Sequence, residues 1–141
     1  MYSNPWYYEE KIFDPDDEFL APYAGFVYII IDNVNNKKYI GKKFFWSTKK
    51  LPPLKGKTRR RIKTVQSDWK KYWGSSNELL EQIEKHGLDK FERYVLRLCN
   101  TKSECAYYEM KEQMDRDVLL THEYYNGFVG GKINGRNLLK E

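Results

Sequence analysis

Residues 25–43, with the sequence GFVYIIIDNVNNKKYIGKK, constrain the fold more than any other stretch of the chain. Phe26 to Ile31 is a run of aromatic and β-branched residues, and Lys38 to Lys43 is a shorter run of the same kind. Asp32 to Asn36 lies between them and is rich in residues that tolerate the left-handed backbone region. The pattern predicts a β-hairpin made of two antiparallel strands.

Further elements are indicated after this hairpin. Phe91 to Cys99 has the composition of a third strand. Ser75 to Glu78 fits a capping box at the start of a helix that ends at Gly87. Thr101 to Glu104 is a second capping box, and it opens a helix that we expect to continue towards Leu120.

The segment from Ser47 to Val65 contains Pro52-Pro53 and several Lys and Arg residues without a steady hydrophobic period. We expect it to be a long basic loop inserted after the second strand. The predicted fold class is therefore α+β, with a small three-stranded antiparallel sheet flanked by helices.

With 141 residues, the chain has the length of a single domain. We expect the domain to occupy residues 25–141, and residues 1–24 to form an acidic and aromatic extension that is solvated. The longest apolar run is too short to span a membrane. Cys99 and Cys105 are too few for a disulfide framework and suit a reducing compartment as core thiols. These features predict a cytoplasmic protein with no membrane partner.

Positive charge is concentrated in one stretch of the chain. Residues 37–71 contain fourteen Lys or Arg residues and a single acidic residue, Asp68. Such density attracts a polyanion, because each neutralised phosphate releases counterions; a solvated loop is the alternative. Nearby aromatic residues are candidates for stacking on bases: Phe44, Phe45, Trp46, Trp69, Tyr72 and Trp73. The expected nucleic-acid-binding residues are Lys49, Lys50, Lys55, Lys57, Arg59, Arg60, Arg61, Lys63, Lys70 and Lys71.

The hairpin itself has features of a reactive site. Alternate side chains of a strand share a face, so Tyr39, Gly41 and Lys43 lie together and Lys42 lies opposite. Gly41 leaves a bare patch beside a phenol, against which a phosphodiester can lie closely. Aromatic residues on strands also serve packing alone, and from the residues themselves both interpretations stay open.

Val27-Tyr28, followed after ten residues by Tyr39-Ile40-Gly41, resembles the paired motif of the GIY-YIG nuclease family. The resemblance extends from about residue 26 to residue 131. Its later segments occur in the same order as in standalone phage members of the family: YIGKK, DWKKYWGSS, NELLEQIEKHG, FERYVLRLC, YYE and EYYN. The first motif is Phe-Val-Tyr here instead of Gly-Ile-Tyr, a change at positions that mainly pack.

This resemblance implies hydrolysis of phosphodiester bonds in double-stranded DNA, assisted by one Mg²⁺ ion, with Mn²⁺ as a substitute. If a phage encodes the protein, the expected cytoplasm is that of the bacterial host. It implies that a motif tyrosine helps to deprotonate the attacking water and that a glutamate on a later helix binds the metal ion. The catalytic residues expected on this basis are Tyr28, Tyr39, Gly41, Lys42, Lys43, Tyr72, Glu109 and Asn126, with Glu109 as the metal ligand.

The basic residue that contacts the phosphate is less directly indicated. Many family members place it on a helix, but no helix can run through Pro52-Pro53. We therefore expect Lys42 or Lys43 in this role, with Arg59 to Arg61 as the alternative, and Tyr72 in place of a later aromatic residue.

Elementary chemistry agrees with these assignments. A free phenol has a pKa of about 10, so a tyrosine acts as a base near neutral pH only if cations stabilise its phenolate. Lys42 and Lys43 are placed to supply that field. Mg²⁺ keeps most of its water ligands, so a single carboxylate can hold it. Glu104 and Glu112 are rivals of Glu109, although Glu104 is already explained as a capping residue.

The sequence leaves three functions open. The first is an endonuclease that draws target preference from the basic loop or from a homodimer. The second is a non-catalytic nucleic-acid-binding protein on the same scaffold. The third is an interaction protein whose lysines meet an acidic partner.

Overall fold

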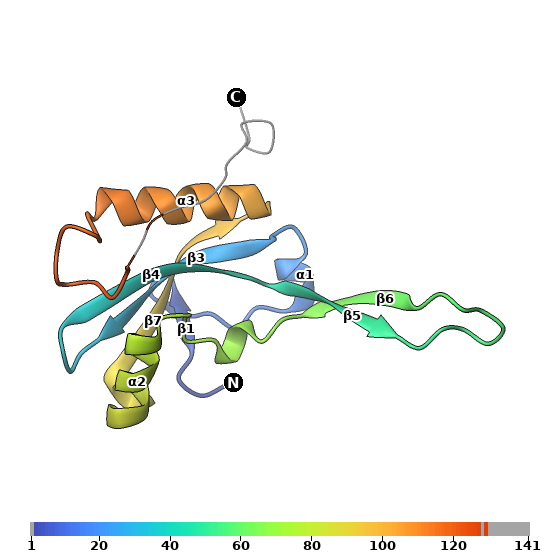
Figure 1. The fold of residues 1–141 in the computed structure, drawn as a ribbon, viewed down its shortest axis with the longest axis horizontal. Coiled ribbons are helices and arrows are strands. Elements are labelled where there is room, and N and C mark those ends of the chain that lie inside the picture. Colours follow the sequence, from blue (N-terminus) through green and yellow to red (C-terminus); the bar gives the residue numbers. More distant parts are fainter. Residues whose placement is uncertain (1, 128, 130–141) are drawn as a thin grey trace.

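The predicted hairpin lies in the sheet of the computed structural model, which describes residues 2–127 and 129 (Figure 1). Strand β3 (Gly25–Asp32) pairs antiparallel with β4 (Lys37–Phe44) over their full length. In the turn, Asn36 has a φ of 55°, and the carboxylate of Asp32 accepts hydrogen bonds from the amides of Val34 and Asn35 at 2.8 and 3.0 Å. The Asp-Asn-rich turn therefore forms as the sequence predicts.

The sheet is wider than expected. Its strand order is β2-β1-β7-β3-β4, where β1 spans Trp6–Tyr8, β2 spans Lys11–Ile12 and β7 spans Phe91–Cys99. The three predicted strands pair antiparallel, as β1 and β2 do with each other, but β1 is parallel to β7. The fold is α+β, as predicted, but the sheet is mixed and five-stranded. Strands of two and three residues are too short to produce a recognisable period in a sequence.

Helices lie on both sides of this sheet. They are α1 (Asp17–Leu20), α2 (Asn77–His86) and α3 (Lys102–Asp115), together with the 3-10 turns η1 (Trp69–Lys71) and η2 (Leu88–Lys90). The N-caps of α2 and α3 are Ser76 and Thr101. The N-cap of α2 is one residue later than Ser75, the first residue of the predicted capping box, and α3 ends at Asp115, before Leu120. Among the residues that the structure describes, no helix is long and apolar enough to span a lipid bilayer.

The expected basic loop is for the most part a second, separate sheet. Strands β5 (Trp46–Leu51) and β6 (Arg61–Gln66) pair antiparallel and form a two-stranded ribbon, residues 46–66, that projects from the body of the molecule (Figure 1). Pro52-Pro53 lies in its tip. The β-branched residues of RIKTVQ indicate a strand at β6, but the many charged residues around them led us to expect a loop.

Two hydrophobic layers hold the sheet. Val27 and Ile29 of β3 face α3 and pack with the buried thiols of Cys99 and Cys105. The opposite layer includes Tyr28 of β3 and three buried side chains from the N-terminal segment: Trp6, Phe13 and Leu20. The expectation of a solvated extension is therefore wrong for these residues. The predicted domain boundary at residue 25 divides this layer, and the last residues of the predicted domain, 130–141, lie outside the described residues.

Several aromatic residues that we expected to stack on bases lie in this layer instead. Phe45 and Trp69 are fully buried, and Trp73 is 9 % exposed. They fill the core between β3 and η1 and are not available to a nucleic acid.

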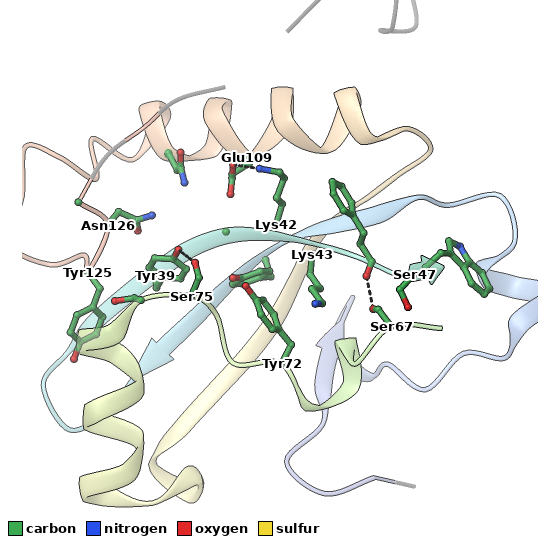
Figure 2. A pocket seen from close by; sticks show the side chains of 17 residues that line it. Tyr39, Lys42, Lys43, Ser47, Ser67, Tyr72, Ser75, Glu109, Tyr125 and Asn126 are labelled. Carbon is green, nitrogen blue, oxygen red and sulfur yellow. Dashed lines mark hydrogen bonds and ion pairs between the residues drawn. The ribbon is translucent and has the colours of Figure 1, made fainter. Parts of the chain in front are cut away.

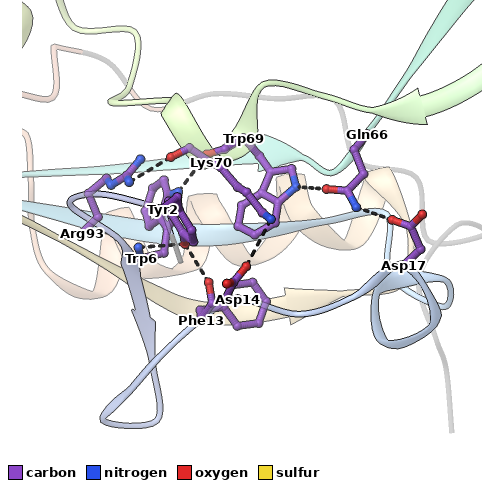
Figure 3. A network of polar contacts seen from close by, with 9 residues as sticks. All are labelled: Tyr2, Trp6, Phe13, Asp14, Asp17, Gln66, Trp69, Lys70 and Arg93. Atoms are coloured by element: carbon purple, nitrogen blue, oxygen red, sulfur yellow. Dashed lines mark hydrogen bonds and ion pairs between the residues drawn. The ribbon is translucent and has the colours of Figure 1, made fainter.

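Arg93 of β7 joins the N-terminal segment to the rest of this layer (Figure 3). Its guanidinium donates to the carbonyl oxygens of Asn4, Lys70 and Tyr72 at 2.5, 3.0 and 2.7 Å. It lies over the rings of Trp6 and Trp73, 4.5 and 4.2 Å from their centres. Burial lowers the pKa of Arg93 to about 10, so the side chain is a cation at neutral pH.

We predict that Arg93→Ala lowers the free energy of unfolding by about 2 to 4 kcal/mol, because three carbonyl groups lose their donor and the contacts of this buried side chain with the rings of Trp6 and Trp73 are lost. Arg97→Ala is the matched control on the same strand, where the guanidinium lies on the ring of Tyr108 and is largely exposed. We expect a decrease of about 0.5 to 1 kcal/mol there. Denaturant titration measures both, and equal decreases would contradict the role assigned to Arg93.

Candidate active site

A pocket of about 580 Å³ opens beside β4 (Figure 2). All residues that the sequence indicated as catalytic line it: Tyr28, Tyr39, Gly41, Lys42, Lys43, Tyr72, Glu109 and Asn126. They come from β3, β4, the segment before α2, α3 and the segment after α3. The structure thus brings together residues that are up to 98 positions apart, as Tyr28 and Asn126 are.

The pocket takes its shape from the position of β4 at the edge of the sheet. Side chains of β4 alternate, so Lys42 lies on the α3 side with Glu109, and Tyr39 and Lys43 lie on the other side with Tyr72 (Figure 2). Gly41 lies on the same face as Tyr39 and Lys43, where it exposes bare backbone next to the Tyr28 and Tyr39 rings. A Cβ atom at this position would overlap the Tyr28 phenol, with its Cζ atom only 2.6 Å away. Glycine is required here because the phenol occupies the space of a side chain.

Three phenols surround this bare backbone. The rings of Tyr39 and Tyr72 have their centres 6.3 and 6.1 Å from that of Tyr28, and Tyr28 itself is 1 % exposed. Burial raises the pKa of Tyr28 well above its ordinary value of 10, and the phenols of Tyr72 and Tyr39 raise it further. Burial also raises the pKa of Tyr39, whose hydroxyl is 3.0 Å from the Ser75 hydroxyl. Both phenols are therefore protonated at neutral pH.

The two lysines of β4 do not bring the pKa of Tyr28 down to or below its ordinary value, contrary to the sequence-based expectation. Each is bound to an acid instead. Lys43 is 2.7 Å from Asp68 and lowers the pKa of that carboxyl group, and its ammonium lies 4.3 Å from the centre of the Tyr72 ring. Lys42 is 3.1 Å from Glu109. The positive charges border the pocket, but they do not offset the burial of the phenol.

Glu109 is the carboxylate that the structure places in the pocket. Its side chain is 14 % exposed, and the ammonium of Lys42 contacts its Oε1. The rivals have other partners: Glu104 is buried at the start of α3 and accepts from the Asn100 amide, and Glu112 pairs with Arg116 at 3.1 Å. Neither lines the pocket.

The donor set at Glu109 fits a hard divalent cation that keeps water ligands. The described residues contain no group of three or more His, Cys, Asp or Glu side chains that could enclose a metal ion. Mg²⁺ does not need such a group, since it commonly binds one or two carboxylates and several waters. Lys42 shows that a positive charge is already accommodated beside this carboxylate.

Asn126 closes the edge of β4 next to Gly41. Its side chain accepts from the amide of Ile40 at 3.0 Å and donates to the carbonyl of the same residue at 2.8 Å. Gln113 of α3 donates to that carbonyl as well, at 3.1 Å. The amide of Asn126 thus replaces a neighbouring strand, and its role is to hold the backbone beside the motif glycine.

The preceding residue is anchored separately. Tyr125 donates its hydroxyl to the buried carboxylate of Asp32 at 2.5 Å. Burial by itself would raise the pKa of Asp32, but the hydrogen bonds from Tyr125 and Asn35 outweigh it and the pKa is lowered. Sequence reasoning did not single out Tyr125, Gln113 or Ser75, which also line the pocket. The EYYN segment contains Tyr125 and the DWKKYWGSS segment contains Ser75, so these two lay within the segments of the resemblance, whereas Gln113 did not.

The expected nucleic-acid-binding residues lie outside the pocket. Most belong to the ribbon, including Arg59 to Arg61, so these arginines do not fold into the site as the alternative required. Lys70 and Lys71 belong to η1, and Lys70 is engaged within the molecule by Asp14 at 3.1 Å. The basic surface and the pocket are thus separate features of the molecule.

Comparison with known families gives a match over most of the chain. The family model of the GIY-YIG domain of the putative endonuclease segE covers residues 6–129, so it includes β1 as well as the hairpin and α3. Neither the curated proteins nor the solved structures contain a match to the chain. The family model covers most of the chain, and residues of the paired motifs line the pocket. The chain therefore belongs to the segE-type GIY-YIG endonuclease family.

Proposed function

We propose that the protein is a divalent-metal-dependent endonuclease that hydrolyses phosphodiester bonds in double-stranded DNA. A single observation carries the proposal: Tyr28, Gly41 and Glu109 border one pocket, together with the two lysines of β4. Family membership implies nuclease activity in general. The cytoplasm of a bacterial cell suits the two free thiols.

The pocket offers a place for one phosphate group. Gly41 allows the DNA backbone to approach the strand closely, because the residue has no side chain. Lys42 and Lys43 lie on either side of this position, 33 % and 21 % exposed, and can each donate to a non-bridging oxygen. Phosphate positioning and charge stabilisation account for most of the rate enhancement in this kind of chemistry.

Glu109 would hold the metal ion, and Mg²⁺ is the ion that best suits its single carboxylate, with Mn²⁺ as a substitute. When bound, the ion would stabilise negative charge on the phosphate and on the leaving oxygen. Lys42, which now pairs with Glu109, would then be free to contact the phosphate.

Tyr28 is the proposed base. Its phenolate form would accept a proton from a water molecule whose oxygen bonds to phosphorus while the bond from phosphorus to the 3′ oxygen breaks. A second water would return a proton to the 3′ oxygen. Tyr39 and Tyr72 flank Tyr28 and would orient the water and the phosphate.

A non-catalytic DNA-binding protein on the same scaffold is the alternative. The observation that favours it is the burial of Tyr28, which opposes formation of the phenolate. Metal-dependent cleavage distinguishes the two functions.

We predict that Glu109→Gln lowers the rate of plasmid nicking in Mg²⁺ by about 10³-fold or more, because metal-dependent charge stabilisation would be removed. Glu112→Gln is the matched control, since it lies three residues away on α3 outside the pocket and pairs with Arg116. It should leave the rate unchanged. DNA binding in the presence of a chelator, with no cleavage by any variant in Mg²⁺ or Mn²⁺, would favour the alternative function.

The raised pKa of Tyr28 predicts an alkaline pH dependence. The phenolate is the reactive form, and its fraction rises about tenfold for each pH unit below the pKa. The logarithm of kcat/KM should therefore increase with a slope near one from about pH 6 to pH 9, without a plateau. Single-turnover assays on a labelled duplex measure this profile.

Tyr28→Phe provides the check on this assignment. We expect a decrease in rate of about 10² to 10⁴-fold for a missing general base, together with a flattened pH profile. A profile of unchanged slope in Tyr28→Phe would show that the titrating group is another one, and Tyr39→Phe and Tyr72→Phe would then identify it.

A further inference from the structure

The ribbon, residues 46–66, is held to the body at its base. Trp46 donates its indole N–H to the Tyr23 carbonyl at 2.9 Å, and the Trp69 indole donates to the Gln66 side chain at 2.9 Å. Ser67 follows β6 directly and donates its hydroxyl to the Phe44 carbonyl at 2.6 Å. Both strands are thus anchored where they leave the body, so the direction of the ribbon relative to the pocket is fixed.

Beyond this base, packing against the described part of the molecule does not account for the stability of the ribbon. Its strands β5 and β6 pair with each other, and most of their residues are exposed. Ile62 is 69 % exposed and Leu54 in the tip is 53 % exposed. An isolated two-stranded hairpin is marginally stable in water. A ribbon that buries so little of its own surface is typical of a segment that binds something else.

Charge identifies the class of partner. The ribbon contains eight Lys or Arg residues and no acidic residue. Within the described part of the chain, none of these eight takes part in an ion pair. Lys49 lies directly opposite Lys63 in the register of the two strands. Like charges at directly opposed positions destabilise a hairpin, so this pair is favourable only when an anion lies against it.

The two faces of the ribbon differ. Lys49, Lys63 and Arg61 share a face with Ser47, which lines the pocket. Lys50 lies on the opposite face with Trp46 and Gln66. Trp46 also borders the pocket, but its indole nitrogen is bound to the Tyr23 carbonyl.

At the base, the Lys50 face meets the acidic N-terminal segment. Gln66 donates to the carboxylate of Asp17 there, and Glu18 is adjacent in α1. These carboxylates would repel a polyanion from that face. A polyanion that enters the pocket therefore continues along the Lys49 face.

We propose that the ribbon lies in the major groove of duplex DNA on one side of the cleavage point, with its Lys49 face towards the DNA. The proposal rests on the proposed function and extends it, because it places the contacts that determine affinity away from the reacting phosphate and on a single side. The major groove of B-DNA, about 12 Å wide, admits a two-stranded ribbon. The major groove of duplex RNA is too deep and narrow for one.

Chain geometry sets the reach of this interaction. Strand β5 continues from β4 with only Phe45 between them, and the two run in a similar direction (Figure 1). Gly41 and Leu51 are ten residues apart, which corresponds to at most about 33 Å of extended chain. That is close to one turn of B-DNA, about 34 Å. The tip, with Lys55, Lys57, Arg59 and Arg60, would reach slightly farther.

The first test compares neighbouring lysines on opposite faces. Affinity for a 40-base-pair duplex DNA is measured by fluorescence anisotropy in a chelator, between about 50 and 200 mM salt. Lys49→Gln and Lys63→Gln should each reduce the slope of log affinity against log salt by about 0.9 for each phosphate that is no longer neutralised. Lys50→Gln should leave the slope almost unchanged. Equal effects of Lys49→Gln and Lys50→Gln, or no effect of either, would overturn the assignment of the faces.

Binding of duplex RNA of the same length tests whether the ribbon lies in the major groove. The proposal predicts weaker binding of RNA and a smaller effect of Lys49→Gln on it, since the ribbon cannot enter the narrow groove. Equal affinity for both duplexes, with equal dependence on Lys49, would overturn the groove assignment.

A shortened ribbon tests the one-sided reach. Replacing residues 50–62 with Asn-Gly joins the opposed pair Lys49 and Lys63 through a two-residue turn and leaves the base intact. Circular dichroism checks that the body is folded. On linear duplexes, the wild-type protein should not cut within about one helical turn of the end on its ribbon side, whereas the shortened protein should cut closer to that end.

Identical cut positions for both proteins would overturn the proposed reach while leaving the nuclease function in place. Conversely, Lys49-dependent binding of duplex DNA without any metal-dependent cleavage would support the groove binding and refute the nuclease function. The two proposals therefore fail in different ways.

Discussion

The contact between the Tyr28 phenol and the bare backbone of Gly41 is the constraint on which the site depends. Because Gly41 has no side chain, the phenol of the neighbouring strand lies across it, and a Cβ atom would remove that space. The contact also lies on an edge strand, so groups from both faces of the sheet can meet around it. Glu109 reaches it from α3 and Tyr72 from the segment before α2. An internal strand would keep those two groups apart.

Much of the remaining structure keeps this edge in position. Asn126 and Gln113 bind the backbone of Ile40, so the outer side of β4 is held without a further strand. On the other face, Arg93 binds the carbonyl of Tyr72 and joins it to the N-terminal segment. The N-terminal segment is therefore part of the support of the pocket and more than an appended tail. This agrees with a family match that begins at residue 6.

The sequence predicted those parts of the fold in which local pattern and tertiary structure agree. The hairpin, β7 and both capped helices belong to this group, since period, turn residues and caps all indicated the same elements. Strands β1 and β2 were not predicted, because two or three residues are too few to show a hydrophobic period. Strands β5 and β6 were not predicted, because their β-branched residues lie among many charged ones. The candidate site residues came from the family resemblance: Tyr28, Tyr39 and Gly41 from the paired motifs, and Tyr72, Glu109 and Asn126 from its later segments. The structure places them around one pocket. The pKa of Tyr28 could not be predicted, since it depends on burial by Trp6 and neighbouring rings that lie far away in the chain.

The positive charges of the pocket and the ribbon fall into two groups, which the proposed function assigns to chemistry and to affinity. The lysines of the pocket are paired with Glu109 and Asp68, so in the absence of DNA they add little long-range field. The ribbon lysines and arginines have no such partners among the described residues and dominate the attraction of a polyanion over a Debye length of about 8 Å. Binding can therefore begin at the ribbon, before the pocket ion pairs open. In the proposed mechanism, opening the Lys42–Glu109 pair would free both a cation for the phosphate and a carboxylate for a metal ion. On that mechanism the pocket would become reactive only when both ligands are present.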